Sequence, residues 1–231
     1  MGLLDGKVAI ITGGGKGIGF GIASAFAEQG ASLFITGRTE GRLAEAAEKL
    51  KGEYGADVAY TVAEGSDEAQ VEAAVAKCVE HFGKLDVMVN NAQASKSGTN
   101  LIDHTKEDFD LAINTGLYGA FFYMKHAFPE LKKTKGCVIN LASGAGLFGK
   151  PGQSSYAAAK EGIRGMTRVA ATEWGKVVFA LGAGIITMLI RNSSGGYPEG
   201  VSFAILLMNI ICPHLNKIGA KKPFGVGGAE K

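Results

Sequence analysis

The chain has 231 residues, of which 46% are hydrophobic and 20% are charged, and its formal net charge is +2. This length fits one domain with a sizeable core, and the composition excludes a disordered chain. The near balance of charge gives no reason to expect nucleic acid as a partner. Glycine is frequent, with 35 residues, which indicates many tight turns or backbone held close to a ligand.

We expect a cytoplasmic protein with no membrane partner. The three cysteines, Cys78, Cys137 and Cys212, are scattered without a CxxC pair, which is typical of reduced thiols rather than a disulfide framework. The opening MGLLDGKVAI lacks the cationic and apolar regions of a secretory signal. The longest charge-free apolar run, Val177–Ile190, is shorter than the about 18 residues that a membrane-spanning helix requires.

Short apolar runs alternate with longer helical patterns along the chain. In chain order the predicted elements are a strand at Val8–Ile11, a helix at Gly17–Gln29, a strand at Ser32–Thr36, a helix at Glu40–Lys51, a strand at Val58–Val62, a helix at Asp67–Phe82, a strand at Leu85–Asn90, a helix at Phe109–Leu131, a strand at Cys137–Leu141 and a helix at Ser155–Trp174. Pro129 is expected to disturb its helix near the end.

Strands that each lead to a helix predict repeated βαβ units, and right-handed crossovers then give a parallel sheet with helices on both faces. The predicted fold is therefore α/β, a doubly wound Rossmann-like sheet, with residues 1–231 forming a single dinucleotide-binding domain. Ligands in such sheets bind at the carboxyl ends of the strands, near the switch in strand order.

A glycine-rich turn, TGGGKGIG at 12–19, joins the first strand to the first helix. Such a turn lets backbone N–H groups approach a pyrophosphate, and the helix N-terminus favours its charge. The alternative is a tight turn without a ligand. The residues expected to bind the cofactor here are Thr12, Gly13, Gly15, Lys16, Gly17, Ile18 and Gly19.

The end of the second strand predicts which dinucleotide binds. It reads Ile35-Thr36-Gly37-Arg38 and carries no carboxylate to hold a ribose 2′-hydroxyl. Gly37 leaves room and Arg38 supplies charge for a 2′-phosphate, with Lys16 as a second cation. The alternative for each cation is a solvated surface charge, but together they favour NADP(H) over NAD(H).

Three residues form a candidate catalytic group. Tyr156 and Lys160 are four residues apart on a predicted helix and so share one face. A neighbouring ammonium stabilises a phenolate, so Lys160 should help Tyr156 exchange a proton with a substrate oxygen. Ser143 follows the fifth strand and could orient a substrate carbonyl. Each residue taken alone is more often structural. The histidines lack the spacing of metal ligands, and no metal is expected.

These motifs together resemble the short-chain dehydrogenase/reductase family. TGGGKGIG at 12–19, NNA at 90–92, Asn114, Ser143 and Tyr156-Ala-Ala-Ala-Lys160 follow the order and spacing of that family over about residues 5–176. The segment SGAGLFGKPGQSSYAAAK is similar to 3-oxoacyl carrier-protein reductases and their relatives.

The resemblance implies an Asn-Ser-Tyr-Lys tetrad. Tyr156 would be the general acid/base, Ser143 would polarise the carbonyl, and Lys160 would support Tyr156 and hold the nicotinamide ribose. Asn114 would keep a proton-relay water in place, and Asn90 with Ala92 would line the adenosine side of the cofactor. Hydride would pass between the nicotinamide and a carbonyl or alcohol carbon without a metal. Family members are often oligomers, so a dimer or tetramer is possible.

The chain also departs from the family pattern. Gln93 stands where NNAG has glycine, and it either loses a close backbone approach or contacts cofactor or substrate. Glu64 stands near the end of the third strand, where the family often has Asp facing adenine. Residues 1–176 are thus a family-like core and residues 177–231 an atypical tail, either divergent or altered by a change of reading frame. A sixth strand is possible within 177–184, and Val201–Cys212 fits a helix or a strand.

The leading hypothesis is an NADP(H)-dependent oxidoreductase for a carbonyl or secondary alcohol, such as a 3-oxoacyl thioester, a hydroxysteroid or a small ketone. Because the tail departs from the pattern, the alternative is a catalytically impaired dinucleotide-binding protein. A structural protein that uses the fold without a cofactor would leave the glycine turn and Arg38 without a purpose.

Overall fold

The computed structural model describes residues 2–174 and 178–180. A parallel sheet of six strands forms the middle layer, in the order β3-β2-β1-β4-β5-β6. The strands are β1 (Val8–Thr12), β2 (Ser32–Gly37), β3 (Val58–Val62), β4 (Val87–Asn90), β5 (Cys137–Asn140) and β6 (Val178–Ala180). The order reverses between β1 and β4, so the doubly wound sheet predicted from the sequence is confirmed.

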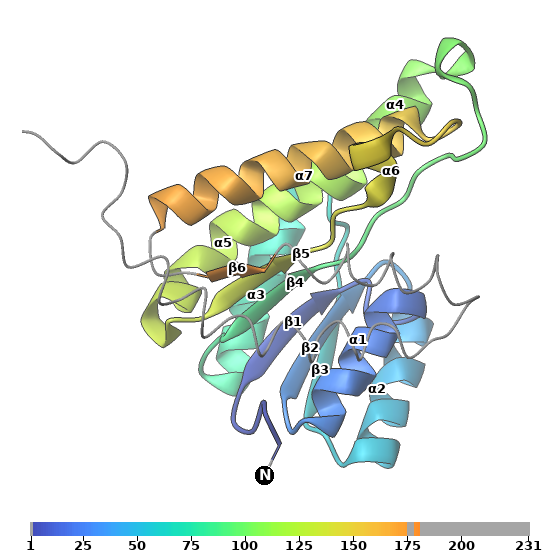
Figure 1. Cartoon of the computed structure of the whole chain (residues 1–231). Coiled ribbons are helices and arrows are strands. Elements are labelled where there is room, and N and C mark those ends of the chain that lie inside the picture. Colours follow the sequence, from blue (N-terminus) through green and yellow to red (C-terminus); the bar gives the residue numbers. More distant parts are fainter. Residues whose placement is uncertain (1, 175–177, 181–231) are drawn as a thin grey trace, which may run out of the picture.

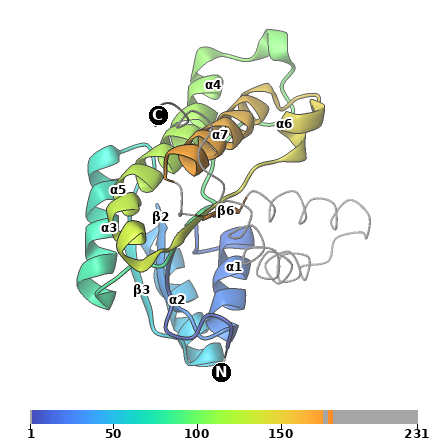
Figure 2. The same ribbon diagram turned by 60° about the vertical axis from the view of Figure 1, so that its left-hand side comes forward.

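Helices cover both faces of this sheet (Figures 1 and 2). The helices are α1 (Gly17–Glu28), α2 (Glu40–Tyr54), α3 (Glu68–Phe82), α4 (Lys106–Ala112), α5 (Gly119–Thr134), α6 (Gly144–Phe148) and α7 (Ser154–Glu173), with a short 3-10 helix η1 (Leu101–Asp103) and a π-helical segment η2 (Ile113–Tyr118). Helices α1 and α2 lie on one face, and α3, α5 and α7 lie on the other.

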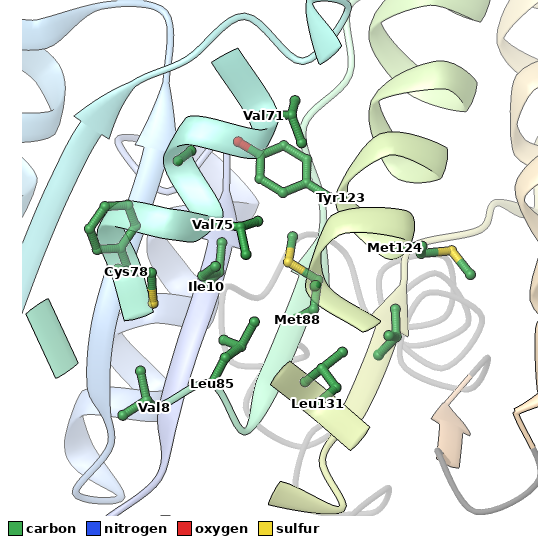
Figure 3. Close-up of a cluster of buried hydrophobic side chains, with 14 of the residues drawn as sticks. Val8, Ile10, Val71, Val75, Cys78, Leu85, Met88, Tyr123, Met124 and Leu131 are labelled. Atoms are coloured by element: carbon green, nitrogen blue, oxygen red, sulfur yellow. The ribbon is translucent and has the colours of Figure 1, made fainter. Parts of the chain in front are cut away.

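Alternation along the strands builds two hydrophobic cores. In β1, Ala9 and Ile11 join the core under α1 and α2, whereas Val8 and Ile10 join the core under α3 and α5. Figure 3 shows the second core, where Tyr123 and Leu131 of α5 pack toward the strands. Because both faces are covered, all of β1 is buried and the strand reads as a continuous apolar run.

The predicted helix at Phe109–Leu131 is longer and less regular than expected. Helical structure runs from Lys106 to Thr134 through α4, η2 and α5, and its middle segment is π-helical. Pro129 lies inside α5, which continues past it to Thr134. The buried side chains of Ala127 and Leu131 on either side anchor this turn to the core, which offsets the hydrogen bond that proline cannot donate.

The sixth strand that the sequence allowed within residues 177–184 is present as β6, which pairs with β5. The prediction for Val201–Cys212 and most of the atypical tail lie outside the described residues. Among the helices that the structure describes, none combines the length and the apolar character needed to cross a membrane.

Candidate active site

A cavity of about 820 Å³ lies at the carboxyl ends of the strands. Its size falls within the range of small-molecule sites, which is roughly 300–1,000 Å³. It joins most of the residues that the sequence singles out: Thr12, Gly13, Gly15, Lys16, Gly17, Ile18, Gly19, Arg38, Ala92, Ser143, Tyr156 and Lys160. Two predicted residues, Asn90 and Asn114, do not line this cavity.

The glycine turn has a backbone that other residues would not tolerate. Gly13 and Gly17 have φ values of +68° and +58°, in the left-handed region that favours glycine. A Cβ on Gly19 would come within 2.2 Å of the Gly13 carbonyl oxygen. The Gly13 N–H donates to the Thr36 carbonyl at the end of β2. The turn is thus folded against two strands and leaves its open side to the cavity.

Thr12 fastens the glycine turn to the loop after β4. Its hydroxyl accepts hydrogen bonds from the backbone N–H groups of Asn91 and Ala92, both at 2.9 Å, and donates to the Val89 carbonyl at 3.3 Å. The Asn91 side chain donates to the Thr12 carbonyl at 2.8 Å. The Thr12 hydroxyl therefore positions the cavity wall instead of pointing free hydrogen-bonding capacity at a ligand.

Asn90 lies behind this wall. Its side chain is buried, and Nδ2 donates to Oδ1 of Asn140 at 2.7 Å, with Asn140 in turn donating to Thr167 on α7 at 2.9 Å. This chain of hydrogen bonds links β4, β5 and α7 below the site. Asn91 and Ala92, not Asn90, face the cavity.

One end of the cavity is cationic. Arg38, Lys16 and Arg42 line it, and Arg42 is a site residue that the sequence reasoning missed although it follows Arg38 by four positions. A carboxylate of Glu64 lies 3.8 Å from the Arg38 guanidinium, whose side chain is 61% exposed. Three cations against one carboxylate leave this end with a net positive charge that suits an anion.

The other end carries the predicted catalytic group. Lys160 is buried, and its Nζ donates to the Leu141 carbonyl at 2.7 Å. Burial lowers the pKa of Lys160 to about 8. The same Nζ lies 5.6 Å from the centre of the Tyr156 ring, as the four-residue spacing on α7 predicts.

Ser143 stands at the N-terminus of α6, directly after β5. It is buried, and its hydroxyl accepts a hydrogen bond from the Ala145 N–H at 3.2 Å. A serine hydroxyl can both accept and donate hydrogen bonds, which is the chemistry needed to orient a substrate oxygen. Ser143, Tyr156 and Lys160 share one cavity.

The structure does not bring Asn114 to this group. Asn114 lies in η2 with an exposed side chain and does not line the cavity, whereas the next residue, Thr115, does. Gln93, the residue that departs from the family pattern, lines the cavity instead. Within the described residues no cluster of histidine, cysteine or carboxylate side chains has the makings of a metal site.

Comparisons with known proteins agree with this geometry. The family model described as short chain dehydrogenase matches residues 7–192, which includes the first part of the segment 177–231. The chain is 54% identical over 211 residues to a 12alpha-hydroxysteroid dehydrogenase from Clostridium sp., covering 86% of this chain and 80% of the relative. It is 39% identical over 175 residues to a 3-oxoacyl-[acyl-carrier-protein] reductase from Chlamydia muridarum, covering 75% and 70% of the two chains.

A solved structure shares the fold. The alcohol dehydrogenase of the archaeon Thermococcus sibiricus, complexed with 5-hydroxy-NADP, superposes with a TM-score of 0.77 at 29% identity. The superposition covers 89% of this chain and 90% of the archaeal chain.

Proposed function

Because the chain belongs to the short-chain dehydrogenase family, whose members act on alcohol or carbonyl groups, we propose that it is an NADP(H)-dependent oxidoreductase that interconverts a secondary alcohol and a ketone. One observation carries the proposal. A single cavity runs from the glycine turn and Arg38 to Ser143, Tyr156 and Lys160, so a dinucleotide and a substrate oxygen have places in one space.

The residues present fit a nicotinamide dinucleotide. A Cβ on Gly13 or Gly19 would meet the turn itself or the Asn91 and Ala92 loop, so these glycines allow the turn to fold beside the N-terminus of α1, where phosphate groups are favoured. The cavity is also lined here by Gly15, Gly17, Ile18 and Ala92. Such a cofactor, when bound, supplies or accepts the hydride.

The chain's own residues would handle the proton. The Tyr156 phenol donates its proton to the substrate oxygen in reduction and takes one from the alcohol in oxidation. The Ser143 hydroxyl donates a hydrogen bond to the same oxygen and so orients it. Lys160, held by the Leu141 carbonyl, keeps a cation beside the Tyr156 ring and favours the phenolate that forms in turnover.

NADP(H) is proposed over NAD(H) on the charge at the far end of the cavity. Arg38, Lys16 and Arg42 can surround a 2′-phosphate, and β2 ends without a carboxylate that would hold a 2′-hydroxyl. Glu64 opposes this preference, because it competes with the phosphate for Arg38.

Hydroxysteroids are the proposed substrate class. The relative at 54% identity is named for a 12α-hydroxysteroid, whereas the relative named for 3-oxoacyl groups is 39% identical. The ring system of a steroid is apolar, and the apolar part of the cavity lining suits it. The 3-oxoacyl thioesters and small ketones of the sequence analysis remain the comparison substrates.

The testing experiment titrates the purified full chain with NADPH and NADH by nucleotide fluorescence, then follows NADPH oxidation with oxo-bile acids, an acetoacetyl thioester and small ketones. Binding of NADPH with turnover of an oxo-steroid supports the proposal. Binding without turnover of any substrate would favour the impaired protein of the sequence analysis, which the comparisons do not support because the relatives are named for reactions. The same preparation, measured by light scattering, tests the predicted homo-oligomer.

A further inference from the structure

The catalytic end of the cavity carries a second ammonium group, on Lys150. Lys150 lines the cavity together with Ser143, Gln153 and Tyr156. Its side chain is exposed and forms no ion pair or hydrogen bond with any described residue. An unpaired lysine is ordinary on an open surface, but this one stands at the wall of the space where the substrate oxygen is proposed to bind.

The backbone around Lys150 is fixed. Helix α6 ends at Gly149, and the N–H groups of Gly149 and Lys150 both donate to the Ala145 carbonyl, at 3.1 and 3.2 Å. The Lys150 carbonyl accepts a hydrogen bond from the Gln153 N–H at 3.2 Å, directly before α7 begins. Because this turn is closed at both ends, Lys150 has a set position relative to the first turn of α7, which carries Tyr156.

A second segment ties the same turn from another side. The Gly98 N–H, in the loop after β4, donates to the Gly152 carbonyl at 2.8 Å. The backbone that carries Lys150 is therefore held by α6, by the start of α7 and by the loop after β4. Only the long side chain of Lys150 is free to adjust, which suits an ammonium that has to reach a charged group on a ligand.

The charges at this end of the cavity have one sign. Among the described residues that line the cavity, the only carboxylate is that of Glu64, which lies 3.8 Å from Arg38 at the nucleotide end. The catalytic end has Lys150 and Lys160 and no acidic side chain. Two cations without a carboxylate attract an anion, so the acidic partner of Lys150 is expected on a ligand.

Apolar side chains accompany this charge. Leu147 and Phe148 stand two or three residues before Lys150 and are 45% and 81% exposed. Leu141 and Ala142, directly before Ser143, line the cavity. Exposed apolar side chains close to a binding site are a common mark of ligand contact. The combination suits a ligand that is apolar over most of its length and negatively charged at one end.

We propose that Lys150 is a specificity-determining residue of this reaction, whose ammonium binds the carboxylate of an oxo-steroid that carries an acidic side chain. The inference rests on the proposed function and narrows its substrate class from hydroxysteroids in general to those with an acidic group. The contact lies away from the reacting oxygen and is the same before and during the reaction, so it should lower KM and leave kcat nearly unchanged.

The test compares an oxo-bile acid with its methyl ester, which keeps the steroid and removes the charge. In Lys150→Met we expect KM for the acid to rise by about three- to tenfold, which is the range for a partly exposed charged contact. KM for the ester, kcat and the Kd for NADPH should change little. An equal rise in KM for acid and ester would overturn the proposal. A loss of NADPH affinity would also overturn it, because Lys150 would then bind the nucleotide.

Further variants separate charge from packing. Lys150→Arg should keep the preference for the acid, and Lys150→Glu should reverse it. Added salt should reduce the preference of the wild type, because it screens the pair. Lys132→Met, which changes an exposed lysine of α5 outside the cavity lining, is the matched control and should leave both KM values unchanged. A preference for the acid that survives Lys150→Glu would contradict the assignment.

Failure of the proposed function has a different signature, which is a wild-type protein that turns over no ketone. Calorimetric titration of the NADPH complex with the acid and with the ester still decides the inference in that case. Tighter binding of the acid to the wild type than to Lys150→Met would support it. A protein that reduces oxo-steroids but does not distinguish acid from ester would overturn the inference alone, and one that binds neither steroid would overturn both.

Discussion

The two ends of the cavity differ in which atoms form their surface, backbone at the glycine turn and side chains at Ser143, Tyr156 and Lys160. At the nucleotide end, backbone makes the surface, since Gly13, Gly17 and Gly19 allow a turn that side chains would block. At the catalytic end, side chains from separate elements make it, with Ser143 after β5 and Tyr156 and Lys160 on α7. A backbone surface is specified locally by the sequence, whereas a side-chain surface depends on how distant elements pack.

This difference predicts that the two ends will respond differently to substitution. Replacing a glycine in the turn should alter the fold of the turn itself, so stability and nucleotide binding should be lost together. Replacing a side chain at the catalytic end should leave the backbone in place, so activity should be lost while nucleotide binding is kept.

Tyr156→Phe should show the largest loss of activity. The substitution removes the phenol that exchanges a proton with the substrate oxygen, and general acid–base groups contribute about 10²–10⁴-fold to rate. The Kd for NADPH should stay close to that of the wild type, because the nucleotide end is untouched. Steady-state kinetics and fluorescence titration measure the two quantities on one preparation.

The control for this variant is Tyr54→Phe, at the end of α2 and away from the cavity. It removes the same hydroxyl from an exposed tyrosine and should leave kcat unchanged. A Tyr156→Phe enzyme with wild-type turnover, or one that no longer binds NADPH, would contradict the division of labour between the two ends.

The sequence predicts the strands, the glycine turn and the place of Tyr156 and Lys160 on one helix, but it does not predict where Asn114 lies. The glycine spacing, the apolar strands and the four-residue spacing of Tyr156 and Lys160 are local patterns, and the structure shows the elements they predict. The place of Asn114 depends on η2, and a π-helical turn has more residues per turn than an α-helix. It shifts which residues face the site, and nothing in the periodicity of the predicted helix at Phe109–Leu131 signals such a shift.

Gln93 is a residue that the sequence marks as unusual without predicting what its side chain contacts. The sequence shows that Gln93 replaces the family's glycine. The side chain of Gln93 packs against Gly116 of η2, and only the packing of the loop after β4 against η2 brings these two residues together. A sequence shows that a residue is unusual, but it does not show which distant residue provides the space for its side chain.

A pH titration should reveal the buried ammonium of Lys160. Burial lowers its pKa from 10.5 to about 8 in the folded protein. Between these pH values the unfolded chain binds more protons than the folded one, so the stability of the folded protein rises with pH. Over this pH range, Lys160 raises the free energy of unfolding by at most about 3 kcal/mol.

The measurement compares the free energy of unfolding of the wild type without nucleotide with that of Lys160→Met across this range. Other lysines titrate in both proteins and cancel in the difference. The wild type should gain stability relative to the variant as pH rises from about 8 toward 10.5. A difference that stays flat with pH would show that Lys160 is solvated.

Two glycines in α1 test the backbone-built end. Gly19→Ala should lose about 1–3 kcal/mol of stability, because its Cβ would come within 2.2 Å of the Gly13 carbonyl oxygen, and NADPH binding should weaken with it. Gly21→Ala, two residues further along, meets no atom within 4 Å and should gain about 0.5–1 kcal/mol as a better helix former. Thermal unfolding and nucleotide titration measure both variants. Equal stability and equal NADPH affinity for the two would contradict a nucleotide surface made of backbone.

The smallest expected effects concern the choice between NADPH and NADH, because Arg38 is largely exposed and shares its charge with Glu64. Arg38→Asp removes the proposed phosphate partner and places a second carboxylate near Glu64. The ratio of the Kd values should then move toward NADH by about tenfold, which corresponds to one charge-assisted contact at an exposed site.

Glu64→Gln releases Arg38 from its competing partner, so it should move the ratio the other way, toward NADPH, by about two- to threefold. Fluorescence titrations with both nucleotides at low and high salt measure these ratios, and the shifts should shrink as salt screens the charges. If the two variants left the ratio unchanged, the cationic end of the cavity would not hold the 2′-phosphate, and Arg38 and Glu64 would be an ordinary surface ion pair.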